Sequence, residues 1–104
     1  MRILFDHGTP APLRDALTSH DIATAFERGW SQLANGELLR QAESAFDLLI
    51  TTDKNLKYQQ NLSGRKLAIL VLSTTSWPRI EKQTAQIAAV NTIKPGDFLE
   101  FEVS

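Results

Sequence analysis

The chain has 104 residues with 11 basic and 12 acidic side chains, a length that fits one domain with a single hydrophobic core. Its formal net charge of −1 excludes an overall positive field that would attract nucleic acids, so such a partner requires a local basic patch. The absence of cysteine excludes disulfides and thiolate metal sites, and no apolar stretch approaches the roughly 18 residues of a membrane span, so we expect a cytoplasmic protein without a membrane partner.

Strand-like and helix-like segments alternate along the chain, beginning with an apolar run over residues 2–6. A run without polar alternation is typical of a strand that is buried on both faces. Pro10 and Pro12 favour the first turn of a helix, whose apolar stripe continues up to His20. Residues 21–26 then predict a second strand.

A second helix is predicted to begin at Asn35, which is a favourable N-cap residue. Its apolar positions define the buried face: Leu38, Leu39, Ala42 and Ala45. The apolar run over residues 48–53 predicts a third strand, which Asp53 closes. Residues 54–62 are polar, and their weak periodicity fits both a short helix and an ordered loop.

The most apolar segment, residues 67–72, predicts the central strand, and residues 73–76 predict an N-capping turn. A further helix begins at Trp77 and Pro78, with its inner face formed by Ile80, Thr84, Ile87 and Ala88. Alternating apolar and acidic residues over 99–103 predict a half-exposed edge strand. The order of these elements predicts an α/β domain with a mostly parallel central sheet of about five strands that is covered by helices.

Two acids, Asp6 and Asp53, each close an apolar strand, which is where ligands bind in open α/β sheets. If these strands are neighbours, both acids lie at the same edge of the sheet, and Glu37 projects toward it from the first turn of its helix. Clustered carboxylates repel one another unless they share a proton or bind a cation, and oxygen ligands favour Mg²⁺ or Mn²⁺. This chemistry suits hydrolysis of a phosphodiester, whereas each Asp taken singly also fits a turn or a helix cap.

Together these residues resemble the PIN-like superfamily, and within it a short branch whose members begin with a strand ending in Asp. The most specific motifs are Leu4-Phe5-Asp6, Asn35-Gly36-Glu37-Leu38-Leu39 and Leu49-Ile50-Thr51-Thr52-Asp53-Lys54-Asn55. The resemblance implies one three-layer PIN-like domain over residues 1–104 and a metal-dependent ribonuclease, often the toxin of a toxin–antitoxin pair. It also implies an acidic pocket in which Asp6, Glu37 and Asp53 serve as catalytic residues and metal ligands.

Two positions depart from the family pattern. His7-Gly8 follows Asp6 where many relatives have Glu-Asn, and Asn35-Gly36 stands where an acid often precedes Glu37. A pocket with one carboxylate fewer would bind metal weakly, take a ligand from the substrate, or be inactive in a domain that only binds a partner. A third interpretation is a receiver-like phospho-acceptor domain, but such a domain requires two adjacent acids after the first strand and a lysine after the last, and neither is present.

Basic side chains near Asp53 are candidates for contact with RNA. Lys54, Lys57 and Arg65 would hold phosphates along a path beside this acid, or they form an ordinary solvated surface. His7 is a candidate for substrate contact, for a general base or for a third metal ligand, with a plain polar loop residue as the alternative. The expected partners are RNA and, by the resemblance, a small antitoxin protein, and a homodimer stays open.

Three other features have both a functional and a structural interpretation. Asp47 begins the third strand at the edge opposite Asp53 and is expected to form a surface turn. Trp30 follows a loop glycine and would contact a substrate or cover the core. The hydroxyls of Ser73 and Thr74 would bind a phosphate or cap the helix that follows.

Overall fold

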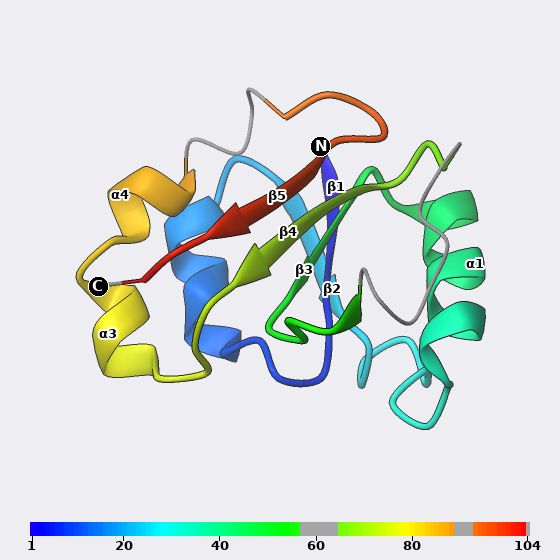
Figure 1. The fold of residues 1–104 in the computed structure, drawn as a ribbon, viewed down its shortest axis with the longest axis horizontal. Helices are drawn as coiled ribbons and strands as arrows, with labels where there is room; N and C mark the ends of the chain where they lie inside the picture. The colour runs from blue at the N-terminus through cyan, green and yellow to red at the C-terminus, as the bar shows by residue number, and fades with distance from the viewer. Residues whose placement is uncertain (57–64, 89–92, 104) are drawn as a thin grey trace.

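A five-stranded sheet forms the centre of the computed structural model, which describes residues 1–56, 65–88 and 93–103 (Figure 1). The strands are β1 (Arg2–Phe5), β2 (Asp21–Thr24), β3 (Leu48–Thr51), β4 (Ala68–Leu72) and β5 (Phe98–Phe101). Their order is β2-β1-β3-β4-β5, and every neighbouring pair is parallel. The predicted α/β class and the parallel sheet are therefore confirmed.

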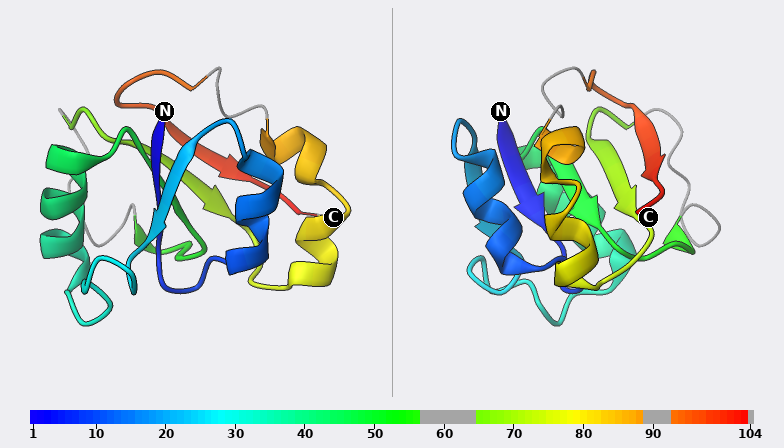
Figure 2. Two further views of the ribbon diagram at one scale, coloured as in Figure 1. Left: turned by 180° about the vertical axis from the view of Figure 1, so that it is seen from behind. Right: turned by 90° about the vertical axis from the view of Figure 1, so that its left-hand side faces the viewer.

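Helices cover both faces of the sheet, which gives the molecule three layers (Figures 1 and 2). They are the 3-10 helix η1 (Ala11–Leu17) and the α-helices α1 (Asn35–Ala45), α3 (Trp77–Glu81) and α4 (Thr84–Ile87). Helix α1 lies on one face, and η1, α3 and α4 lie together on the other. None of the helices within the described ranges has the length and apolar character needed to cross a bilayer.

Two hydrophobic clusters, one on each face, form the core. Alternate residues of β1 point to opposite faces, so Ile3 and Phe5 pack toward η1 and α3, whereas Leu4 packs toward α1. All residues of β3 and β4 are buried, as expected for strands covered on both faces. Burial of each large aliphatic side chain contributes about 1.5–3 kcal/mol to folding, and the two clusters hold the sheet between its helices.

Several boundaries differ from the predicted ones. The segment after Pro10 is a 3-10 helix that ends at Leu17, before His20, and its first bond joins the Leu13 N–H to the Pro10 carbonyl three residues back. The N-cap of α1 is Ala34 rather than Asn35, which is the first helical residue. Such one-residue shifts are common at helix ends, where backbone geometry rather than residue preference decides the boundary.

The helix expected from Trp77 onward is divided into α3 and α4. Gln83, between them, leaves the helical conformation with φ −124° and ψ 22°. Ile80 and Ile87 nevertheless both enter the cluster on the η1 face, so the predicted inner face is preserved. The most apolar strand, β4, is an interior strand but not the central one, because β3 occupies the middle of the order.

The last strand has the predicted edge position but only part of the predicted alternation. Strand β5 pairs with β4 alone, so one of its edges is unpaired within the sheet. Phe101 and Val103 pack against the cluster on the η1 face, as expected. Leu99 is 43% exposed, whereas Phe98 packs on the α1 face instead. An edge strand with one neighbour is less covered on each face, so burial specifies its alternation of apolar and polar residues less strictly.

Candidate active site

The chain changes the direction in which it adds strands to the sheet at β1. From β1 the chain crosses to β2 on one side and then returns to β3 on the other, so β1 lies between them. In open α/β sheets the crevice beyond the carboxyl ends at such a point is where ligands bind. Asp6 directly follows β1 and Asp53 lies two residues beyond β3, so both follow the carboxyl ends of neighbouring parallel strands.

A hollow of about 300 Å³ lies at this point, and both acids line it. The expectation that the strand ends bring Asp6 and Asp53 to one edge is therefore confirmed. The other walls come from the loop after β1, the loop that follows β2, the start of α1 and the end of β3: His7, Gly8, Ala25, Trp30, Ser31, Leu33, Leu38, Thr51 and Thr52. We call this hollow the acidic pocket.

The hydroxyl of Thr51 links the two acids. It donates a hydrogen bond of 2.8 Å to Oδ2 of Asp6 and accepts one of 3.1 Å from the backbone N–H of Asp53. Thr51 is 1% exposed, so this hydroxyl has little access to water and its bonds fix the relative position of the two residues. Oδ1 of Asp53 also accepts a 3.0 Å bond from the Asn55 N–H, which orients that carboxylate.

The loop after β1 is anchored against β3. The Thr9 hydroxyl is buried and donates to the Ile50 carbonyl at 2.8 Å, while the Thr9 N–H donates to the Asp6 carbonyl at 3.0 Å. Gly8 makes a close approach to the end of β3, because a Cβ at this position would overlap Oγ1 of Thr52 and that side chain would have to move. A Cβ there would also lie 3.6 Å from the Thr75 methyl, so the loop after β4 reaches the same edge.

Glu37 is not brought into the acidic pocket. Its carboxylate accepts a 2.9 Å hydrogen bond from the Gln41 side chain and forms an ion pair with Arg40, both along the surface of α1. These contacts, with the Gln41 bond first, hold the pKa of Glu37 below its usual value. Leu38, the next residue, lines the pocket instead. The predicted three-acid constellation is thus corrected to a pair, because the turn of the helix directs Glu37 along its own surface.

The basic residues predicted beside Asp53 are separated in the structure. Lys54 is exposed directly after this acid. Arg65 precedes β4 at the opposite edge of the sheet, where it pairs with Glu43 of α1 at 3.5 Å, so its prediction as a neighbour of Asp53 is wrong. Lys57 lies outside the described residues. Of the predicted basic path, Lys54 therefore remains beside Asp53, although it does not line the acidic pocket itself.

Three of the dual interpretations are now resolved by contacts. Asp47 lies at the opposite edge and accepts a 2.8 Å bond from the Arg2 N–H, which lowers the pKa of Asp47 and makes it structural, as predicted. Trp30 packs edge-on against Phe46, with ring centroids 6.1 Å apart, so it covers the core. It also lines the pocket, and its contact with a substrate stays a prediction. The Ser73 hydroxyl accepts from the Val103 N–H at 2.8 Å and ties the end of the chain to β4.

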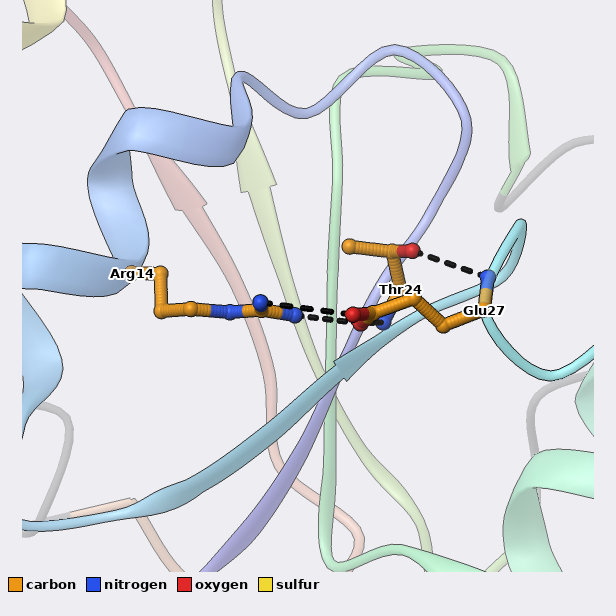
Figure 3. Close-up of polar contacts among 3 residues, drawn as sticks. All are labelled: Arg14, Thr24 and Glu27. Atoms are coloured by element: carbon orange, nitrogen blue, oxygen red, sulfur yellow. Dashed lines mark hydrogen bonds and ion pairs between the residues drawn. The ribbon is translucent and has the colours of Figure 1, made fainter.

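A set of contacts that the sequence analysis missed shapes the loop after β2 (Figure 3). Thr24 and Glu27 exchange hydrogen bonds: the Glu27 N–H donates to Oγ1 of Thr24 at 3.1 Å, and the Thr24 N–H donates to Oε1 of Glu27 at 2.9 Å. Both terminal nitrogens of Arg14, in η1, donate hydrogen bonds to the same Glu27 carboxylate. A Thr and a Glu three residues apart are the signature of this reciprocal arrangement, so the signal was present.

The two carboxylates of the acidic pocket offer oxygen ligands, which suit Mg²⁺ or Mn²⁺ rather than a softer metal, and His7 adds an imidazole nitrogen to the same lining. Among the described parts of the chain, no three His, Asp or Glu side chains are grouped closely enough to hold a metal ion by themselves. Two carboxylates still fit Mg²⁺, which is commonly held by one or two carboxylates, water and the phosphates of a substrate. The residues present therefore fit a metal ion that binds together with a phosphate.

No protein-family model, no curated protein and no solved structure matches this chain.

Proposed function

We propose that this chain is a metal-dependent endoribonuclease of the PIN-like type, which hydrolyses RNA phosphodiesters at the acidic pocket. The observation that carries the proposal is the pair Asp6 and Asp53, which line one pocket at the reversal of strand order and are linked through the Thr51 hydroxyl. Pairing with a small antitoxin protein belongs to the same proposal and rests on the sequence resemblance. A cytoplasmic location is proposed from the composition of the sequence, which has no cysteine and no apolar stretch of membrane length.

Each residue has a role that follows from its position. Asp6 and Asp53 would hold Mg²⁺ or Mn²⁺, which when bound supplies positive charge at the phosphodiester and orients a water for attack. Thr51 keeps the Asp6 carboxylate in place through its buried hydrogen bond. His7 lines the acidic pocket and is exposed, and Lys54 is exposed next to Asp53, so both would contact phosphate oxygens of the incoming strand.

The test is cleavage of single-stranded RNA by purified protein with and without Mg²⁺ or Mn²⁺. Wild type is expected to cleave only with the metal, and Asp53→Asn is expected to lose at least about a hundredfold in rate, since a lost metal ligand removes several kcal/mol of charge stabilisation. Glu37→Gln is the matched control, because it removes the same charge from a carboxylate that pairs along α1. We expect it to lose less than about tenfold.

Two results would refute the ribonuclease proposal. One is wild-type protein that cleaves no RNA of varied sequence in either metal. The other is an Asp53→Asn variant that cleaves as fast as wild type, which would indicate a contaminating nuclease. A folded wild type without activity would favour a domain that only binds a partner, an interpretation that the position of Glu37 outside the pocket also fits.

A receiver-like phospho-acceptor domain is the second candidate, and one observation favours it. The order β2-β1-β3-β4-β5 with all strands parallel is also the order of receiver domains. Asp53 then corresponds to the acceptor after β3, and Ser73 or Thr74 to the hydroxyl after β4. Against it, Asp6 is followed by His7, and Ser73 is occupied by the end of the chain. Incubation with acetyl phosphate and Mg²⁺, followed by intact-mass measurement, tests this candidate: a phosphorylated Asp53 would support it.

A further inference from the structure

An exposed aromatic side chain stands beside the acidic pocket. Phe26 is 81% exposed, more than any other large hydrophobic side chain in the described residues. It follows β2 and lines a second hollow of about 260 Å³, whose other walls are mostly small or apolar. We call this the Phe26 hollow. A largely exposed phenyl ring next to a hollow is an arrangement that a planar, apolar ligand group would cover.

The Phe26 hollow and the acidic pocket share a wall. Asp6, His7 and Ala25 line both of them, so the Asp6-His7 segment lies between the two. A phosphate held beside Asp6 would therefore have the Phe26 hollow directly next to it. In a nucleic acid strand every phosphate has a base as its neighbour, and proteins that bind unpaired strands commonly stack these bases on aromatic rings.

The turn that presents Phe26 is tied to the same strand as the acid. The Ala25 N–H donates to the Phe5 carbonyl at 2.9 Å, which connects the turn to the end of β1. On the other side, the contacts among Thr24, Glu27 and Arg14 hold the turn against η1 (Figure 3). The backbone that carries Phe26 is thus fixed relative to Asp6 before any ligand binds, which lowers the entropic cost of binding there.

We propose that Phe26 and its hollow form a subsite that stacks one unpaired nucleobase next to the scissile phosphate. The inference rests on the proposed ribonuclease function and specifies its substrate as single-stranded RNA. Stacking tolerates every base, because each has a flat face, so this subsite selects unpaired strands without selecting a sequence. A base inside a duplex is already stacked on its neighbours and is not available to Phe26.

The test compares two RNA oligomers that differ at one nucleotide next to the cleavage site, which is intact in one and abasic in the other. On intact RNA, Phe26→Ala is expected to raise KM at least about fivefold, the lower end of what one lost base stack costs. Phe26→Trp keeps an aromatic platform and is expected to retain the wild-type KM. On abasic RNA, wild type and Phe26→Ala are expected to have the same KM, because the stacking partner is gone from both.

Leu99→Ala is the matched control, since it truncates another exposed apolar side chain on the distant edge strand β5. It is expected to leave KM unchanged, and equal melting temperatures of all variants confirm that they are folded. An unchanged KM of Phe26→Ala on intact RNA overturns the subsite and leaves the ribonuclease proposal standing. An equal loss on intact and abasic RNA also overturns it, because that pattern indicates a structural role.

Binding separates the two proposals if wild type has no cleavage activity. Fluorescence anisotropy with a labelled single-stranded oligomer in Ca²⁺ measures affinity without requiring chemistry. At least about fivefold weaker binding by Phe26→Ala supports the subsite even if the ribonuclease proposal fails. Equal binding, or no binding by wild type, overturns it. So does a dimer in sedimentation that Phe26→Ala dissociates while RNA affinity is unchanged, because Phe26 would then be a contact between copies.

Discussion

The hydroxyl of Thr51 is a polar group in a strand whose every residue is buried. Such a group costs free energy unless it is paired, and here both of its hydrogen-bonding roles are used at the acidic pocket. It donates to a carboxylate, and hydrogen bonds to charged groups are stronger than neutral ones. A threonine in this position therefore positions Asp6 and the backbone of Asp53 together, which a valine of the same shape would not do.

We predict that Thr51→Val lowers the free energy of unfolding by about 1.5–3 kcal/mol, the range for a lost hydrogen bond to a charged group. Valine fills the same volume, so the loss reports the hydroxyl rather than a cavity. Urea denaturation at neutral pH measures it. Thr51→Ser keeps the hydroxyl and is the matched control, expected to lose less than Thr51→Val. A Thr51→Val protein as stable as wild type would contradict this account of the pocket.

At the scale of elements, the turn after β2 is held by side chains from two segments. Thr24 and Glu27 close the turn with reciprocal hydrogen bonds, and Arg14 reaches it from η1 (Figure 3). The hydrogen bond from Arg14 and that from the Thr24 N–H lower the pKa of Glu27 from its ordinary value of 4.5. These bonds favour the ionised carboxylate, so the turn is stabilised only while Glu27 carries its charge.

The lowered pKa of Glu27 predicts a pH dependence with a definite sign. A group whose pKa is lower in the folded state contributes stability above its unfolded value, here 4.5, and loses it as pH falls through the lower folded value. We expect the stability difference between wild type and Glu27→Gln to be constant above about pH 5.5 and to shrink below pH 4.5. Thermal unfolding followed by circular dichroism from pH 3 to about 7 measures this difference.

Glu81→Gln provides the baseline for this series, because it makes the same change of charge at an exposed position on α3. The stability difference between wild type and Glu81→Gln measures the general effect of a lost negative charge. It is subtracted from the difference between wild type and Glu27→Gln. A wild-type minus Glu27→Gln difference that stays flat across the acidic range would mean that the contacts with Arg14 and Thr24 do not persist in solution.

At the scale of the whole molecule, the acidic pocket depends on the order of strands. Asp6 and Asp53 are 47 positions apart in the sequence and meet because β1 and β3 are hydrogen-bonded neighbours in the same direction. Ile3 pairs with Leu48 and Phe5 with Ile50, so the two strands end nearly level. The pocket therefore exists only in the folded chain. An ion that binds there binds the folded state alone and stabilises it against unfolding.

We therefore predict that Mg²⁺ or Mn²⁺ raises the melting temperature of wild type but not of Asp6→Asn/Asp53→Asn. At about ten times the dissociation constant the ion adds about 1.4 kcal/mol, which is several degrees for a domain of this size. Differential scanning fluorimetry measures the shift. Asp15→Asn/Asp21→Asn removes two exposed acids outside the pocket and should shift like wild type. Equal shifts in all three proteins would indicate nonspecific binding of the ion.

The sequence by itself determined the fold class and the edge on which the two acids lie. The apolar runs before Asp6 and Asp53 are long enough to be recognised as buried strands, because burial on both faces removes the polar positions. Alternation with helices then requires parallel strands with their carboxyl ends at one edge. These inferences depend on hydrophobicity and chain connectivity, which are local properties of the sequence.

The tertiary structure alone decided which side chains complete the site. Residue type indicated that Glu37 is near it, but the direction of its side chain depends on helix rotation and on partners such as Gln41. Arg65 is far from it for another reason, because it precedes β4 at the opposite edge, where it pairs with Glu43. Phe26 was counted in a strand, whereas the Thr24 turn ends that strand and exposes the ring. The sequence also leaves the order of the strands open. The hydrophobic pattern predicts that these segments form strands, whereas long-range packing determines which strands become neighbours in the sheet.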